Sequence, residues 1–253
     1  MSIPRILHFF WHDVADIPPP IQDAIETTQK THDDFDVMMS SDETAKALME
    51  DLFPPLAPLY ERIRIPAARA DVARMALLYK HGGVYIDGSK AMYKPFTDIF
   101  DFAKSHALLR RDDGAPYKNR PHAAHFVNSV LAAAPSTNFI SDCIKRIHFN
   151  LASGIHNFHV PAATGPLIVT QAFRARRHLD DLPVYNFSQL SNSFFHSQRV
   201  AGVNNTWLEQ QLDGIIDPAY YGHEGLSERV LAAYPLMKET PVARLKRLLQ
   251  LKI

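Results

Sequence analysis

Buried strands and amphipathic helices alternate along the chain. The apolar run 3–11 is rich in residues that favour strands, which predicts a buried first strand. Three consecutive prolines end it, and a helical period follows. The same patterns predict helices at 21–31, 42–50, 66–81, 136–151, 166–177 and 227–234, and strands at 35–39, 84–86, 107–109 and 184–187. The stretch around Pro54, Pro55 and Pro58 predicts a turn-rich connection, and 110–120 a polar loop.

Helices that alternate with short buried strands favour an α/β layered domain with a mostly parallel sheet. The 253 residues contain no internal repeat and no low-complexity linker, so we expect one domain over residues 1–240 and a short helix at 241–253. In that last segment Leu245 and Leu248 alternate with basic residues such as Arg247. This pattern is typical of a basic amphipathic helix on an anionic membrane surface; packing on its own domain or on a partner chain is the alternative.

Composition narrows the class of protein. Lys and Arg together number 27, as do Asp and Glu, so the bulk charge gives no argument for binding nucleic acid. The N-terminus lacks the pattern of a signal peptide, and no window approaches the roughly 20 apolar residues that cross a bilayer. We therefore expect a cytoplasmic protein, with peripheral contact at the inner face of the membrane as the role of the terminal helix.

Two acidic residues and one arginine are spaced so that they converge. Asp71 and Arg74 are three residues apart on a predicted helix and therefore share a face. Gly82 and Gly83 end that helix, and the next strand delivers Asp87 at its carboxyl end, where open α/β sheets bind ligands. Carboxylates and a guanidinium together suit a polyhydroxylated ligand that bears phosphates. The alternative is a surface ion pair at Asp71 and Arg74, with Asp87 capping a turn.

This segment resembles the sugar-binding region of glycosyltransferase family 32, the mannosyltransferase-like family with a DxD motif. It is also similar to the glucosylating domain of the large clostridial toxins. Those proteins carry S-D-x-x-R and then G-G-x-Y-x-D-x-D, where this chain has Ala70–Arg74 and Gly82–Ser89. Weaker points of likeness are the opening Ile3–Trp11, Asn128 with the Ala-rich stretch before Pro135, Thr164–Pro166, and the late pair Thr206 and Trp207.

The resemblance implies a GT-A-type nucleotide-sugar-binding fold and a hexosyltransferase. Its donor is expected to be a UDP-sugar or GDP-sugar, and its acceptor a glycan or a lipid-linked oligosaccharide. Relatives of this kind retain the configuration of the transferred sugar, and the sequence shows no acid/base carboxylate pair of the glycosidase kind. Two alternatives stay open: a catalytically degenerate domain that serves as a binding or assembly module, and a toxin-like effector that glycosylates a host protein.

The resemblance assigns donor-binding roles to Phe10, Trp11, Asp71, Arg74, Asp87, Asn128 and Trp207. Trp11 is expected to stack on the base of the donor, unless it is a core residue at a strand end. Asp71 and Arg74 are expected to hold the hydroxyls of the donor sugar. Asp87 is expected to bind the ribose or the sugar and to position a metal ion, and with Asp71 and Arg74 it forms the implied catalytic group. Asn128 is expected to contact the donor near the reacting carbon; its alternative role is a loop-capping amide.

The last position of the motif departs from the family pattern. Ser89 stands where the family has its second Asp, the usual ligand of Mn²⁺ or Mg²⁺, and Lys90 follows it. A hard cation prefers charged oxygen ligands. Three outcomes are open: a cation bound by Asp87, Ser89, the diphosphate and late residues such as Asn205 or His196; a diphosphate neutralised by Lys90 or an arginine without metal; or a weakened transferase. The first is the working expectation, because the leaving diphosphate needs positive charge.

Overall fold

The computed structural model describes residues 1–111, 126–187, 195–197, 207–222 and 229. Within them, a six-stranded sheet has the order β2-β1-β3-β6-β5-β7. Its strands are β1 (Ile6–Phe10), β2 (Asp36–Ser40), β3 (Gly83–Ile86), β5 (His106–Arg110), β6 (Val130–Ala133) and β7 (Val184–Asn186). The helices are α1 (Pro19–Thr31), α2 (Asp42–Leu52), α3 (Ala57–Arg62), α4 (Pro66–His81), α6 (Asn138–Ser153), α7 (Val160–Ala163), α8 (Pro166–Arg176) and α10 (Trp207–Gln210).

The sheet is mostly parallel, as expected. Strand β1 pairs in parallel with β2 and β3, and β5 pairs in parallel with β7. Strand β6 alone among the strands of this sheet runs in the opposite direction, between β3 and β5. The α/β fold class with a mostly parallel sheet is therefore confirmed, with one antiparallel strand inside it.

The structure contains elements that the sequence pattern did not predict. The proline-rich connection contains helix α3, because Pro58 lies in its first turn, where a missing N–H costs no hydrogen bond. Strand β6 was not predicted, because its alanines have little strand propensity and its pairing partners lie far away in the sequence. A second, two-stranded sheet joins β4 (Lys90–Met92) to β8 (Phe195–Ser197). The predicted helix at 227–234 apart from Arg229, the predicted helix at 241–253 and most of the loop at 110–120 lie outside the described residues.

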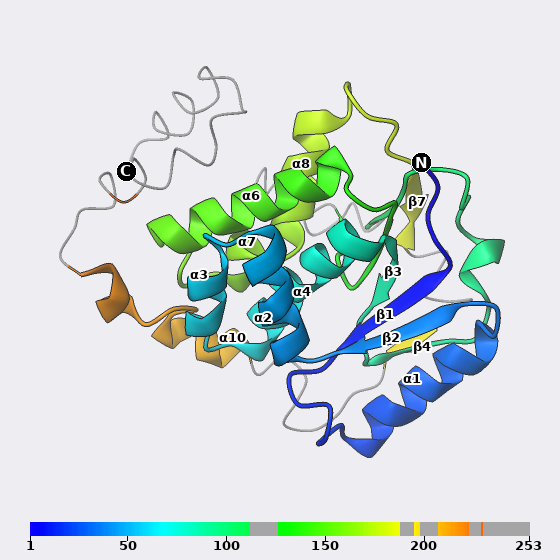
Figure 1. Ribbon diagram of the computed structural model, residues 1–253, viewed down its shortest axis with the longest axis horizontal. Helices are drawn as coiled ribbons and strands as arrows, with labels where there is room; N and C mark the ends of the chain where they lie inside the picture. Colours follow the sequence, from blue (N-terminus) through cyan, green and yellow to red (C-terminus); the bar gives the residue numbers. More distant parts are fainter. Residues whose placement is uncertain (112–125, 188–194, 198–206, 223–228, 230–253) are drawn as a thin grey trace.

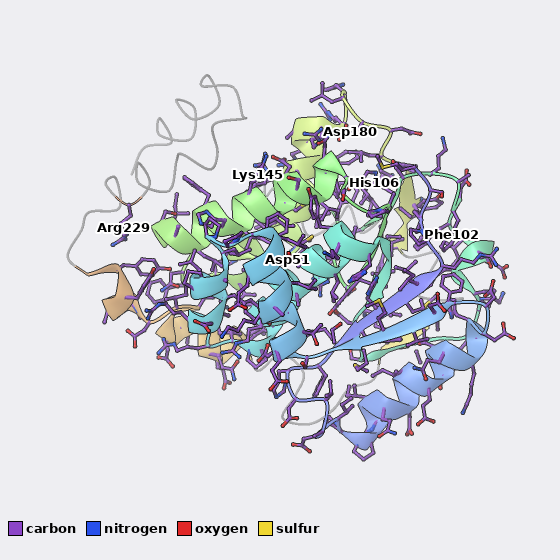
Figure 2. All side chains as sticks on the ribbon, in the orientation of Figure 1. Asp51, Phe102, His106, Lys145, Asp180 and Arg229 are labelled. Carbon is purple, nitrogen blue, oxygen red and sulfur yellow. The ribbon has the colours of Figure 1, made fainter. Side chains whose placement is uncertain are left out.

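Helices cover both faces of the sheet (Figure 1). Helix α1 packs against β4 on one side, where Leu7 and Phe9 of β1 enter a core with Ile21. Helices α2, α4 and α6 pack together on the other side, around a larger core. Figure 2 shows how side chains fill the space between these layers. In the described part of the chain, no helix combines the length and the apolar character that crossing a bilayer requires.

Two glycines set the path from α4 into β3. Gly82 and Gly83 have φ values of 65° and 97°, which favour glycine. A Cβ at Gly83 would lie 2.6 Å from the backbone oxygen of Ile6, and one at Gly82 would lie 2.7 Å from Pro135 Cδ. The buried His8 ring nitrogen Nε2 lies 2.6 Å from the Gly82 carbonyl oxygen, to which it donates. This packed reversal fixes where β3, and the residues after it, emerge.

We predict that Gly83→Ala destabilises the fold more than Gly222→Ala. Both positions have positive φ, but the Cβ at Gly222 would meet no atom of the described residues within 4 Å. The control should lose about 1–2 kcal/mol of unfolding free energy from backbone strain alone, and Gly83→Ala should lose several kcal/mol more because the clash is with backbone. Urea denaturation measures both variants. Equal losses would contradict the close packing of the reversal.

A second prediction concerns His8 and acid. Burial lowers the pKa of His8 to about 4, although the Gly82 carbonyl opposes this shift. The unfolded chain takes up a proton here near pH 6.5, whereas the folded chain stays neutral until about pH 4, so stability falls as the pH drops through this window. His8→Gln keeps a donor for the carbonyl and should lose roughly 2–3 kcal/mol less than the wild type between pH 6.5 and 4.5. Denaturation at both pH values tests this; identical losses would contradict it.

Candidate functional site

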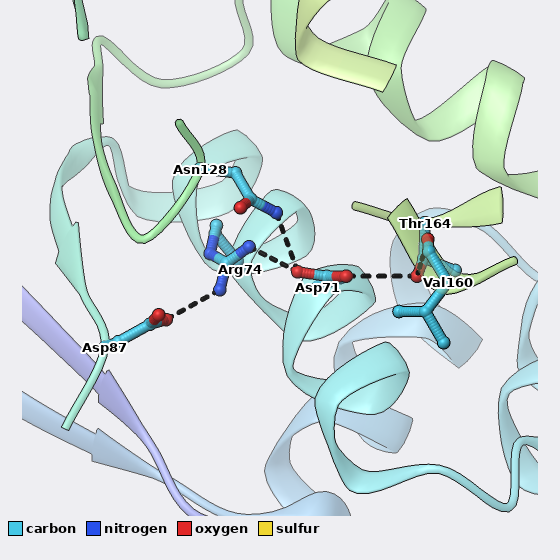
Figure 3. Close-up of polar contacts among 6 residues, drawn as sticks. All are labelled: Asp71, Arg74, Asp87, Asn128, Val160 and Thr164. Carbon is cyan, nitrogen blue, oxygen red and sulfur yellow. Dashed lines mark hydrogen bonds and ion pairs between the residues drawn. The ribbon is translucent and has the colours of Figure 1, made fainter. Parts of the chain in front are cut away.

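Asp71 is the centre of a buried polar network on helix α4. Its Oδ1 accepts hydrogen bonds from Arg74 Nη1 at 2.6 Å and from Asn128 Nδ2 at 2.7 Å. Its Oδ2 accepts from Thr164 Oγ1 at 3.1 Å (Figure 3). Burial raises the pKa of the Asp71 carboxyl, while the Arg74 guanidinium acts in the opposite direction. Three donors from three segments therefore fix both carboxylate oxygens in place.

Arg74 links Asp71 to Asp87. Its side chain is 3% exposed, and its Nη2 donates to Asp87 Oδ1 at 2.8 Å. The guanidinium carbon lies 4.4 Å from the centre of the Tyr85 ring on β3, within the range of a cation–π contact. Burial alone would lower the pKa of Arg74, but the surrounding Tyr85, Asp87 and Asp71 groups raise it, so the charge is held. A buried guanidinium flanked by two carboxylates joins α4 to the end of β3.

Asp87 is the exposed end of this network. It follows β3 directly, and its side chain is 34% exposed, against 10% for Asp71. Its backbone N–H donates to the Ser129 carbonyl at 2.9 Å, and its own carbonyl accepts from the Lys90 N–H at 2.9 Å, so a tight turn carries it. The carboxylate is thus held from behind by Arg74 and remains open to a ligand at the carboxyl end of the sheet.

The three aromatic residues that were predicted to bind the donor make other contacts. Trp11 follows β1 at its carboxyl end and is half-buried; its Nε1 donates to the Asp16 carbonyl at 3.1 Å. Phe10 is 6% exposed and packs in the larger core. Trp207 begins α10 and packs partly against the same core. The structure therefore brings Asp71, Arg74, Asp87 and Asn128 together, whereas the roles of these three aromatic residues stay predictions.

The described side chains fit a divalent cation poorly. Both oxygens of Asp71 and Oδ1 of Asp87 already accept hydrogen bonds from protein donors. Ser89 offers a neutral hydroxyl, whereas Mn²⁺ and Mg²⁺ prefer charged oxygen ligands. In the part of the chain that the structure describes, no group of three or more His, Cys, Asp or Glu side chains could hold a metal ion. Asn205 and the side chain of His196, the other expected ligands, lie outside the described residues.

Comparison with known proteins supports the same region. The family model described as "Glycosyltransferase sugar-binding region containing DXD motif" matches residues 18–106, which include Asp71, Arg74, Asp87 and Ser89. Residues 18–106 are therefore similar to this glycosyltransferase sugar-binding region. The resemblance to this family, inferred from the motif, is therefore confirmed, and Ser89 is a departure within the matched region.

Curated relatives show moderate similarity. Inositol phosphoceramide mannosyltransferase 3 of Schizosaccharomyces pombe is 24% identical over 190 residues, which are 73% of this chain and 49% of the relative. The alpha-1,4-N-acetylglucosaminyltransferase of Homo sapiens is 25% identical over 163 residues, or 61% of this chain and 41% of the relative. The chain spans about half the length of the curated relatives it matches.

Two solved toxin domains share the fold. The PaToxG glycosyltransferase has a TM-score of 0.55 at 18% identity and covers 94% of this chain and 87% of its own. The UDP-bound glycosyltransferase domain from the YGT toxin has a TM-score of 0.52 at 9% identity, over 73% of this chain and 80% of its own. These similarities confirm the expected GT-A-type fold.

Two residues of the site were missed as contributors to its geometry. Thr164 was noted only as part of a family-like Thr-Gly-Pro, but its hydroxyl reaches Asp71 from 93 residues away. The neighbouring Gly165 permits this approach, because a Cβ there would lie 3.2 Å from Asp71 Oδ2. Tyr85, a position of the G-G-x-Y motif, supports Arg74 with its ring. The positions of both residues in the motifs could be seen in the sequence, whereas their contacts with Asp71 and Arg74 form only in the folded protein.

We predict that Thr164→Val weakens nucleotide-sugar affinity by about three- to tenfold, because Asp71 Oδ2 loses its donor and the carboxylate is held less firmly. Thr170→Val on α8 is the control: Thr170 is also fully buried, but its hydroxyl donates to the Pro166 carbonyl and accepts from the Phe126 N–H, with no contact to Asp71. Both variants should lose about 1 kcal/mol of stability. Calorimetric titration with a nucleotide sugar separates them, and equal affinity losses would contradict a positioning role for Thr164.

Proposed function

We propose that this protein transfers a hexose from a nucleoside diphosphate sugar to an acceptor hydroxyl. One observation carries the proposal: the buried Asp71–Arg74–Asp87 network, inside the matched sugar-binding region, presents one open carboxylate at the carboxyl end of β3. Relatives named as mannosyl- and N-acetylglucosaminyltransferases, and a solved toxin domain of the same fold with bound UDP, support a UDP-sugar or GDP-sugar as donor.

The network suits the donor chemically. Asp87 can accept hydrogen bonds from ribose or sugar hydroxyls, and the buried Arg74 guanidinium holds a positive charge beside it. When the bond from the sugar to the diphosphate breaks, negative charge grows on the diphosphate, and a fixed positive charge stabilises it. Because Arg74 is held by Asp71, Asp87 and Tyr85, it needs no rearrangement to act.

The finer parts of the proposal concern stereochemistry, acceptor and location. We propose transfer with retention of the anomeric configuration, to a glycan or a lipid-linked oligosaccharide. Relatives named for inositol phosphoceramide support an acceptor that carries a lipid. A cytoplasmic protein whose segment 241–253 contacts the inner face of the membrane would reach such an acceptor. That basic, leucine-containing segment supports the idea from its sequence pattern.

The test is a panel of UDP-sugars and GDP-sugars, scored by thermal shift and by donor hydrolysis, with Mn²⁺ and with a chelator. A productive donor at about 100 times its Kd should raise the Tm by roughly 5 °C or more. Asp87→Asn should abolish the shift and the hydrolysis. Asp51→Asn, at an exposed carboxylate paired with Lys80, is the control and should behave as the wild type. A wild type that responds to no donor would sink the proposal.

A second candidate is a degenerate domain that binds a nucleotide sugar without turning it over. Ser89, in place of the second Asp, favours it. The same panel distinguishes the two: a donor that shifts the Tm but is neither hydrolysed nor transferred, with Mn²⁺ or with a chelator, would support the binding module. Hydrolysis or transfer under either condition would exclude it.

A further inference from the structure

We propose that Lys90 provides the positive charge that a divalent cation supplies at an intact DxD motif, so that this chain binds a nucleoside diphosphate without metal. The inference rests on the proposed function and concerns the same site. In this inference Lys90 contacts the diphosphate, and Ser89 and Lys90 together replace the second Asp of the motif and its cation.

The oxygen ligands that a cation would need are already in use. Asp71 accepts three hydrogen bonds from Arg74, Asn128 and Thr164, and Oδ1 of Asp87 accepts from Arg74. From the matched motif this leaves Oδ2 of Asp87 and the neutral hydroxyl of Ser89. A cation there would also stand close to the buried Arg74 charge, which opposes it. These contacts suit an anionic ligand beside Arg74 better than a bare metal ion.

Lys90 lies at this edge of the site. It begins β4, and the hydrogen bond from its N–H to the Asp87 carbonyl closes the turn that carries Asp87 and Ser89. The residue is 9% exposed, and its carbonyl accepts from Thr28 Oγ1 of α1 at 3.3 Å, so its backbone is fixed. The ammonium lies near enough to Asp87 and Arg74 for both charges to act on it. A buried cation therefore neighbours the open carboxylate.

The electrostatics of Lys90 favour an anionic partner. Burial lowers the pKa of the Lys90 ammonium, Asp87 opposes that shift, and Arg74 lowers the pKa further. Arg74 and Lys90 are therefore two cations close to the same Asp87 carboxylate. A diphosphate beside them would add negative charge next to both and accept charge-assisted hydrogen bonds from Lys90.

Net charge makes Ser89 and Lys90 equivalent to a carboxylate plus a metal ion. An Asp at 89 with a bound divalent cation contributes one negative and two positive charges, which leaves one positive charge. A neutral Ser89 with the Lys90 ammonium also leaves one positive charge. The diphosphate would therefore meet the same local charge in both designs, which is the quantity that stabilises a leaving group of this kind.

The experiment is calorimetric titration of UDP and of GDP into the full chain, in EDTA and in Mn²⁺. For whichever nucleotide binds, wild-type affinity should differ by less than about threefold between the two conditions. Lys90→Gln keeps a polar side chain, one bond shorter, but removes the charge, and it should weaken binding in EDTA by roughly 10- to 100-fold. Lys94→Gln, an exposed lysine four residues on, is the matched control and should bind as the wild type.

Lys90→Gln changes a buried residue, so thermal melting must show that this variant folds. Ser89→Asp is a second variant that tests the same inference at a less buried position. Ser89 is half-buried in a turn, so a substitution there disturbs less packing than one at a buried residue. The new charge should cancel that of Lys90, weaken binding in EDTA about tenfold, and make binding depend on Mn²⁺.

The outcomes separate the inference from the proposed function. Wild-type binding that requires Mn²⁺ overturns the inference and leaves the transferase proposal standing. A folded Lys90→Gln protein with wild-type affinity in EDTA would also overturn the inference alone. A Ser89→Asp protein that gains no dependence on Mn²⁺ would do the same. A wild type that binds neither nucleotide in either condition overturns the proposed function and the inference together.

Discussion

A buried chain of alternating charges, from Asp71 through Arg74 to Asp87, is the interaction on which this site depends. It joins helix α4 to the end of strand β3 through hydrogen bonds of 2.6 and 2.8 Å. Taking such charges out of water is costly, and removing one partner of a buried pair typically costs about 3–5 kcal/mol. The network persists because each member is paired: Asn128 and Thr164 complete the contacts of Asp71, and the Tyr85 ring lies under Arg74.

The surrounding fold keeps this geometry fixed. The positive φ angles of Gly82 and Gly83 turn the chain sharply from α4 into β3, and their missing side chains allow close contact with Pro135 and Ile6. The position of Asp87 after β3 is therefore fixed. Arg74 holds its Oδ1, and the side chain stays partly exposed to a ligand. A charged group held in this way acts on a ligand without reorganising, which is how such sites stabilise developing charge.

Local signals predicted the elements that carry the site. The proline at its start, the helical period and the double glycine at its end define α4, and the apolar run before Asp87 defines β3. Helical spacing placed Asp71 and Arg74 on one face. Contacts distant in sequence were beyond such reasoning: Thr164 meets Asp71 only because α7 packs against α4, and the alanine-rich β6 is a strand because β3 and β5 flank it. Phe10 alternates with Phe9 along β1, and the strand pattern alone could not say which layer each residue would enter.

The claim that the Asp71–Arg74–Asp87 network binds a nucleotide sugar is tested most directly by a crystal structure of the chain with bound UDP or GDP. We predict difference density for the diphosphate at the carboxyl end of β3, with its oxygens within hydrogen-bond distance of Arg74 or Lys90 and the ribose beside Asp87. Density at a site that touches none of these three side chains would contradict the claim.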